Sequence, residues 1–90
     1  MGHAHCNGWD IPGLIEKLAP RLCALHLHDN NGKSDQHRAI CTGTINWEPV
    51  FSAMAKLPES CSLILEYMPG IPLSELEDSV KILKKQLNIA

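Results

Sequence analysis

All five histidines of the ninety-residue chain fall within its first 37 residues. Asp35 stands two residues before His37, and Glu66 is the only acidic residue in the apolar run 61–67. A carboxylate in such a run is costly unless it is paired, protonated or bound to a metal. Neutral imidazole and ionised carboxylate are ligands for zinc, manganese, iron or cobalt. We therefore expect a divalent metal site drawn from the following residues: His3, His26, Asp35, His37 and Glu66.

A structural interpretation of single histidines stays open beside this one. His5 and His28 in particular can be read as satisfied polar ends of strands with no chemical role. A Ser or Cys nucleophile is disfavoured, because no such residue stands in a nucleophile-elbow context. The motifs of a phosphate-cradling glycine loop are absent from the sequence.

Two nearly continuous apolar runs, 22–28 and 61–67, predict strands that carry these residues near their carboxyl ends. Such runs are typical of parallel strands buried on both faces. Because side chains alternate along a strand, His26 and His28 should point to the same side. Residues 3–5 are interpreted as the end of an earlier strand. The long connection 29–45 is expected to be functional.

Helical patterns separate and follow these strands. The first helix should begin after Asp10 and be closed by Pro20. The second is expected over 47–57, with Asn46 as its cap, and the third should begin at a capping box from Ser74 and end near Asn88. A helix between successive strands implies parallel pairing. The prediction is an α/β fold of roughly three strand–helix units.

Composition excludes several other classes of protein. The apolar fraction is 44% and the net charge is −2, so the chain resembles a globular domain and has no basic field for a polyanion. Its apolar runs are far shorter than the roughly 20 residues that cross a bilayer, and its start lacks the features of a secretory signal. The four cysteines form no Cys-x-x-Cys pair, which favours free thiols and a cytoplasmic location.

Five segments taken together resemble one known family. They are Gly2-His3-Ala4-His5, Leu25-His26-Leu27-His28-Asp29-Asn30, Asp35-Gln36-His37, Gly43-Thr44-Ile45-Asn46-Trp47 and Leu63-Ile64-Leu65-Glu66. Their order and spacing are similar to the carboxyl-terminal third of xylose isomerase-like TIM barrels, the sugar phosphate isomerases and epimerases and their apurinic-endonuclease relatives. The resemblance covers essentially residues 1–90. It implies the last three βα units of a partial (β/α)8 barrel, a carboxyl-terminal fragment of that domain.

The resemblance also implies a role for each matching residue. His26 and Glu66 correspond to metal ligands, with Glu66 also a possible catalytic base, and His3 to a catalytic histidine that contacts substrate. Asp35 and His37 resemble the pair that holds an additional metal. Trp47, in the loop that shapes the pocket, would bind substrate. In that family an aspartate ligand would fall one residue before Met1, and Cys41 stands where a loop glycine is usual.

The implied function is metal-dependent isomerisation or epimerisation of a sugar or sugar phosphate, with Mn, Zn, Mg or Co as the ion. We expect the ninety-residue chain by itself to be inactive, because part of the family's ligand set lies upstream. Two alternatives remain open. One is cleavage of DNA at abasic sites, which the absence of a basic stripe disfavours. The other is an inactive or assembling chain that associates through open sheet edges.

Overall fold

A computed structural model describes residues 1–89 of the chain. Its two strands pair in parallel, with Ala24 opposite Ser62 and Leu27 opposite Leu65. The predicted α/β class and the parallel pairing are therefore confirmed. The elements in chain order are α1 (Gly2–Cys6), α2 (Ile11–Leu18), a 3₁₀ turn (Ala19–Arg21), β1 (Ala24–Leu27), α3 (Trp47–Met54), β2 (Ser62–Leu65) and α4 (Leu73–Gln86).

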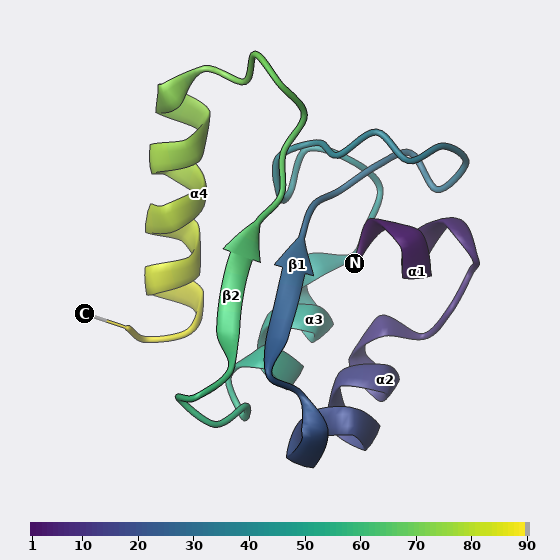
Figure 1. Ribbon diagram of the computed structural model, residues 1–90, viewed down its shortest axis with the longest axis vertical. Coiled ribbons are helices and arrows are strands. Elements are labelled where there is room, and N and C mark those ends of the chain that lie inside the picture. Colours follow the sequence, from purple (N-terminus) through teal and green to yellow (C-terminus); the bar gives the residue numbers. More distant parts are fainter. Residues whose placement is uncertain (90) are drawn as a thin grey trace.

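The sheet has one covered and one exposed face. Burial alternates along β1, where Ala24 and His26 are exposed while Leu27 is fully buried. Their partners in β2, Ser62 and Ile64, are also exposed. The prediction that both faces are buried is thus wrong for residues 1–89, since helices cover only the side facing α3 (Figure 1).

The helix starts agree only partly with the sequence signals. Asp10 caps α2 as predicted, its side chain accepting a hydrogen bond from the Gly13 amide at 3.2 Å. Asn46 occupies the cap position of α3 without a capping hydrogen bond from its side chain, and α3 ends at Met54 rather than near residue 57. The capping box from Ser74 is wrong: α4 begins at Leu73, directly after Pro72.

The expected end of a strand at residues 3–5 is also wrong. Gly2–Cys6 form the short helix α1, in which the His5 amide donates to the Met1 carbonyl at 3.0 Å. The amino group of Met1 donates to the carbonyl of His26 at 2.8 Å, so α1 lies beside β1. Alternating polar and apolar residues over such a short stretch do not separate one helical turn from a strand.

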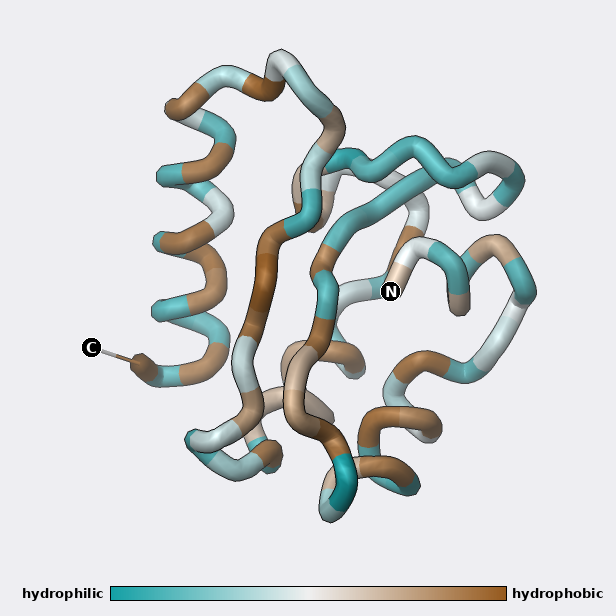
Figure 2. The backbone as a smooth tube through the Cα atoms, viewed as in Figure 1, coloured by the Kyte–Doolittle hydropathy of each residue, from teal (hydrophilic) through white to brown (hydrophobic). Residues whose placement is uncertain are grey.

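The apolar core lies between the sheet and α3. Leu27, Ile40 and Val50 are its most buried members, and Ile15 from α2 and Leu83 from α4 also belong to it. Figure 2 shows hydrophobic residues along β2 and hydrophilic residues in the chain that follows β1. The four cysteines are free, as predicted. Among the helices described, none has both the length and the apolar character needed to cross a membrane.

Candidate metal centre

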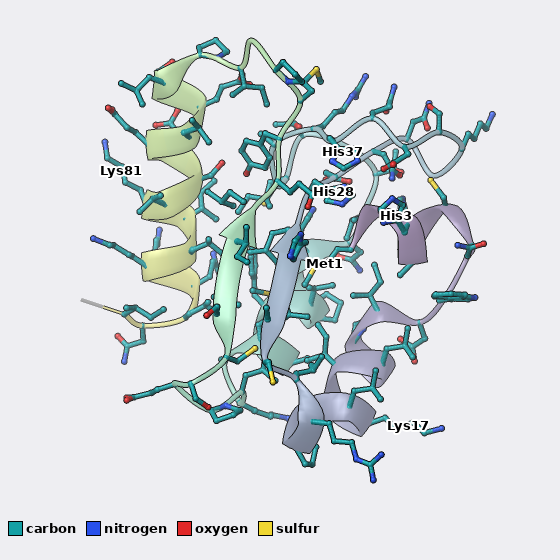
Figure 3. The ribbon with its side chains drawn as sticks, in the orientation of Figure 1. Met1, His3, Lys17, His28, His37 and Lys81 are labelled. Carbon is teal, nitrogen blue, oxygen red and sulfur yellow. The ribbon has the colours of Figure 1, made fainter. Side chains whose placement is uncertain are left out.

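The ionisable residues gather where β1 and β2 end. The amide of Glu66 donates to the carbonyl of Leu27 at 3.1 Å, which extends the strand pairing one step beyond β2. This bond puts the side chain of Glu66 beside the residues that follow β1. The carboxyl ends of parallel strands are where α/β proteins build their sites. Figure 3 shows His3, His28 and His37 together at this end, while Lys17 and Lys81 point outward.

Asp29 organises the loop that follows β1. Its carboxylate is fully buried and accepts hydrogen bonds from the amides of Asn30, Gly43 and Ile45 at 2.8, 2.9 and 3.2 Å. The indole N–H of Trp47 donates to the same carboxylate at 2.7 Å. Four donors therefore compensate the burial of this charge, as a buried carboxylate requires.

The same loop presents His37 from a strained backbone. Asp29 and Arg38 form an isolated antiparallel bridge, with hydrogen bonds of 2.8 and 2.9 Å. Next to it, His37 has φ of 49°, a left-handed conformation that is uncommon for a residue with a side chain. The Met68 amide donates a hydrogen bond to the His37 carbonyl at 3.0 Å. Strain maintained by such contacts is found at functional sites.

Asp35 joins two of the histidines. Its Oδ2 atom accepts from Nε2 of His3 at 2.9 Å and from Nε2 of His37 at 3.0 Å. Partial burial acts to raise the pKa of Asp35, but the hydrogen bonds from His37 and His3 outweigh it and the pKa is lowered. Asp35 is therefore anionic at neutral pH.

Glu66 joins His37 to one further histidine, His26. Nδ1 of His26 donates to its Oε2 atom, and Nδ1 of His37 lies 3.3 Å from its Oε1 atom. The hydrogen bond from His26 is the main reason that the pKa of Glu66 is lowered. Burial acts to lower the pKa of His37, yet its contacts with Asp35 and Glu66 raise it. Two ionised carboxylates thus alternate with imidazoles.

His28 is the most buried member of the group. It is 1% exposed, and its Nδ1 atom has no hydrogen-bond partner within residues 1–89. Burial is the main reason that its pKa is lowered to about 4, so the imidazole is neutral at pH 7. Gly2 packs directly on the ring, and a Cβ atom at that position would overlap Cε1 and Nδ1 of His28. The site therefore requires glycine there.

We call these residues the histidine–carboxylate cluster: His3, His26, His28, Asp35, His37 and Glu66. Two sets of three have one donor atom each within 4.8 Å of one another and could hold a metal: His3 with Asp35 and His37, and His28 with His37 and Glu66. His37 belongs to both. His26 reaches the cluster through Glu66 and is in neither set.

The cluster includes the five predicted metal-site residues and differs from the sequence expectation at two positions, Trp47 and His28. Trp47 does not face it: the side chain is buried in the core, with its N–H on Asp29. His28, interpreted as a polar strand end, lies inside the cluster. The signal for His28 was its place two residues after His26: His26 hydrogen-bonds Glu66, and a donor atom of His28 lies within 4.8 Å of one on Glu66.

Donor chemistry and burial both fit a divalent cation. Nitrogen and oxygen ligands in one cluster suit zinc, manganese or cobalt, and the buried nitrogen of His28 has no hydrogen-bond partner among the described residues.

Comparison with known proteins gave one finding. No curated protein and no solved structure matched the chain. The sequence model of the xylose isomerase-like TIM barrel family matches residues 1–86, which include every member of the cluster. Two parallel strands with flanking helices are consistent with part of such a barrel. The chain therefore belongs to the xylose isomerase-like TIM barrel family.

Proposed function

We propose that the cluster is the carboxyl-terminal part of the site of a metal-dependent isomerase or epimerase acting on a sugar or sugar phosphate. The observation that supports this most is Glu66, an ionised carboxylate at the end of β2 that contacts both His26 and His37. The proposed ligands of the ion are His26, Asp35, His37 and Glu66. A complete barrel of this fold has about eight strands, of which residues 1–89 form two.

The chain's own residues would bind substrate and move a proton. When bound, the ion would polarise the carbonyl and the neighbouring hydroxyl of the sugar. Glu66 is the proposed base that removes a proton from the carbon beside the carbonyl and returns it to the neighbouring carbon. His26 donates to Glu66 and thereby orients the carboxylate. His3, whose side chain is 67% exposed, is the residue best placed to contact substrate hydroxyls.

The test is turnover with Mn²⁺ or Co²⁺ over a panel of aldoses, ketoses and their phosphates, followed by NMR. Both the ninety-residue chain and any longer protein that contains this chain are assayed. We expect metal-dependent interconversion that Glu66→Gln reduces by roughly 10²–10⁴-fold. Glu59→Gln, at an exposed turn before β2, is the matched control and should retain full activity. The proposal is contradicted if Glu66→Gln retains turnover. It is also contradicted if no preparation shows turnover.

The set of His3, Asp35 and His37 favours a second candidate. Their resemblance to the additional metal site of the endonucleases supports phosphodiester cleavage at abasic sites. The same preparations should be tested with abasic-site DNA. Cleavage without sugar turnover would replace the first proposal with this one. We also propose a cytoplasmic location, which the four free cysteines support.

A further inference from the structure

His28 is the residue whose environment the preceding contacts leave unexplained. Its ring is 1% exposed, yet within residues 1–89 nothing accepts from or donates to its Nδ1 atom. A buried polar atom without a partner costs about 1–3 kcal/mol. Native proteins rarely retain such an atom unless a water, an ion or a ligand meets it.

The carboxylate of Asp35 does not satisfy Nδ1 of His28. Nδ1 of His28 lies 4.0 Å from Oδ1 of Asp35, beyond hydrogen-bonding range. Two atoms that each bind the same ion at about 2.0–2.2 Å can lie up to roughly 4.4 Å apart. One donor atom from each of His28, His37 and Glu66 lies within 4.8 Å of the others, a bound slightly wider than this limit. A single cation could therefore bind these three side chains after small movements.

The ring of His28 is also held in position. It stacks on His37, with centroids 4.0 Å apart and planes 9° apart. The ring also packs against Gly2, where an added methyl group would overlap the imidazole. A donor fixed on both sides loses little freedom when it binds an ion, which favours affinity.

We propose that His28 is a direct ligand of a divalent cation, together with His37 and Glu66. This inner site differs from the set of His3, Asp35 and His37, and the family resemblance gives His28 no ligand role. Borderline ions such as zinc, cobalt and cadmium suit two imidazoles and a carboxylate. The inference shares with the proposed function the need for a metal, but it requires no substrate.

The direct test uses the unmutated chain with labelled histidine nitrogens and NMR-active cadmium. We expect a scalar coupling between cadmium and a ring nitrogen of His28, and another to His37. Coupling to His3 and His37 without coupling to His28 would place the ion in the set of His3, Asp35 and His37 and overturn the inference. So would the absence of any cadmium binding. Coupling at His28 in a preparation without sugar turnover would leave the inference standing and contradict the proposed function.

A variant pair gives a second test. His28→Gln should weaken binding of Co²⁺, measured by calorimetry and by the cobalt absorption spectrum, by at least about tenfold. His5→Gln is the control, because His5 lies outside the cluster and bonds Thr44 at 2.7 Å. Equal affinity in His28→Gln and the unmutated chain would overturn the inference. If His28→Gln does not fold, the cadmium coupling in the unmutated chain decides the question.

Discussion

His28 and His37 lie face to face, with ring centroids 4.0 Å apart. His3 meets both rings edge-on, at 5.4 and 5.9 Å. Three imidazoles from α1, the end of β1 and the following loop therefore form one continuous unit. Folding has already paid the cost of ordering these side chains, so an ion that binds them needs little further ordering.

Zinc should stabilise the fold measurably. A ligand that binds only the folded state at one hundred times its Kd adds about 2.7 kcal/mol to the free energy of unfolding. For a chain of this size that corresponds to a rise in Tm of roughly 10–20 °C. Thermal unfolding followed by circular dichroism, with zinc and then with excess chelator, measures it. An unchanged Tm would show that the cluster binds no zinc.

Asp29→Asn should destabilise the protein strongly. The NH₂ group that replaces one carboxylate oxygen would face N–H donors. The negative charge that accepts four hydrogen bonds would also be lost. We expect the free energy of unfolding to fall by at least ~3 kcal/mol, measured by urea denaturation. Asp78→Asn on exposed α4 is the matched control and should change it by less than ~0.5 kcal/mol. Equal stability of the two variants would refute a structural role for Asp29.

The sequence was sufficient to predict β1 and β2 and the end of the sheet at which the ionisable residues gather. Strand pairing and the clustering of His26 and Glu66 follow from two apolar runs that end in polar residues. The approach of Asp35 and His37 to that edge depends on the Asp29–Arg38 bridge. Loop length and motif order indicated that approach, but no local pattern encodes the bridge itself.

Other features depend on tertiary contacts that no short pattern records. The helical conformation of Gly2–Cys6 is tied to the packing of Gly2 on His28. The role of Trp47 was misjudged because its indole N–H has a buried acceptor, Asp29, eighteen residues earlier in the chain. Exposure of one sheet face was missed because Ile64 is apolar yet lies on the uncovered side.

Cys41→Gly should stabilise the loop. Cys41 has φ of 67°, in the left-handed region, where a Cβ atom costs about 1–2 kcal/mol. The exposed thiol contributes little packing. Urea denaturation should show a gain of about 1 kcal/mol after the entropy cost of glycine is subtracted. Lys33→Gly, at an exposed loop residue without positive φ, should instead lower stability.

The thiol of Cys41 should also react slowly with iodoacetamide. Partial desolvation of the Cys41 thiol, and then the charge of nearby Asp29, raises the pKa of Cys41 above its ordinary value. Because the thiolate is the nucleophile, a raised pKa lowers its fraction at any given pH and moves the midpoint of the rate–pH profile upward. Peptide mass spectrometry across a pH series should place that midpoint above about 8.5, the value of a free cysteine. Cys23, also exposed, provides the internal comparison, and a midpoint for Cys41 at or below that of Cys23 would contradict the combined effect of desolvation and Asp29.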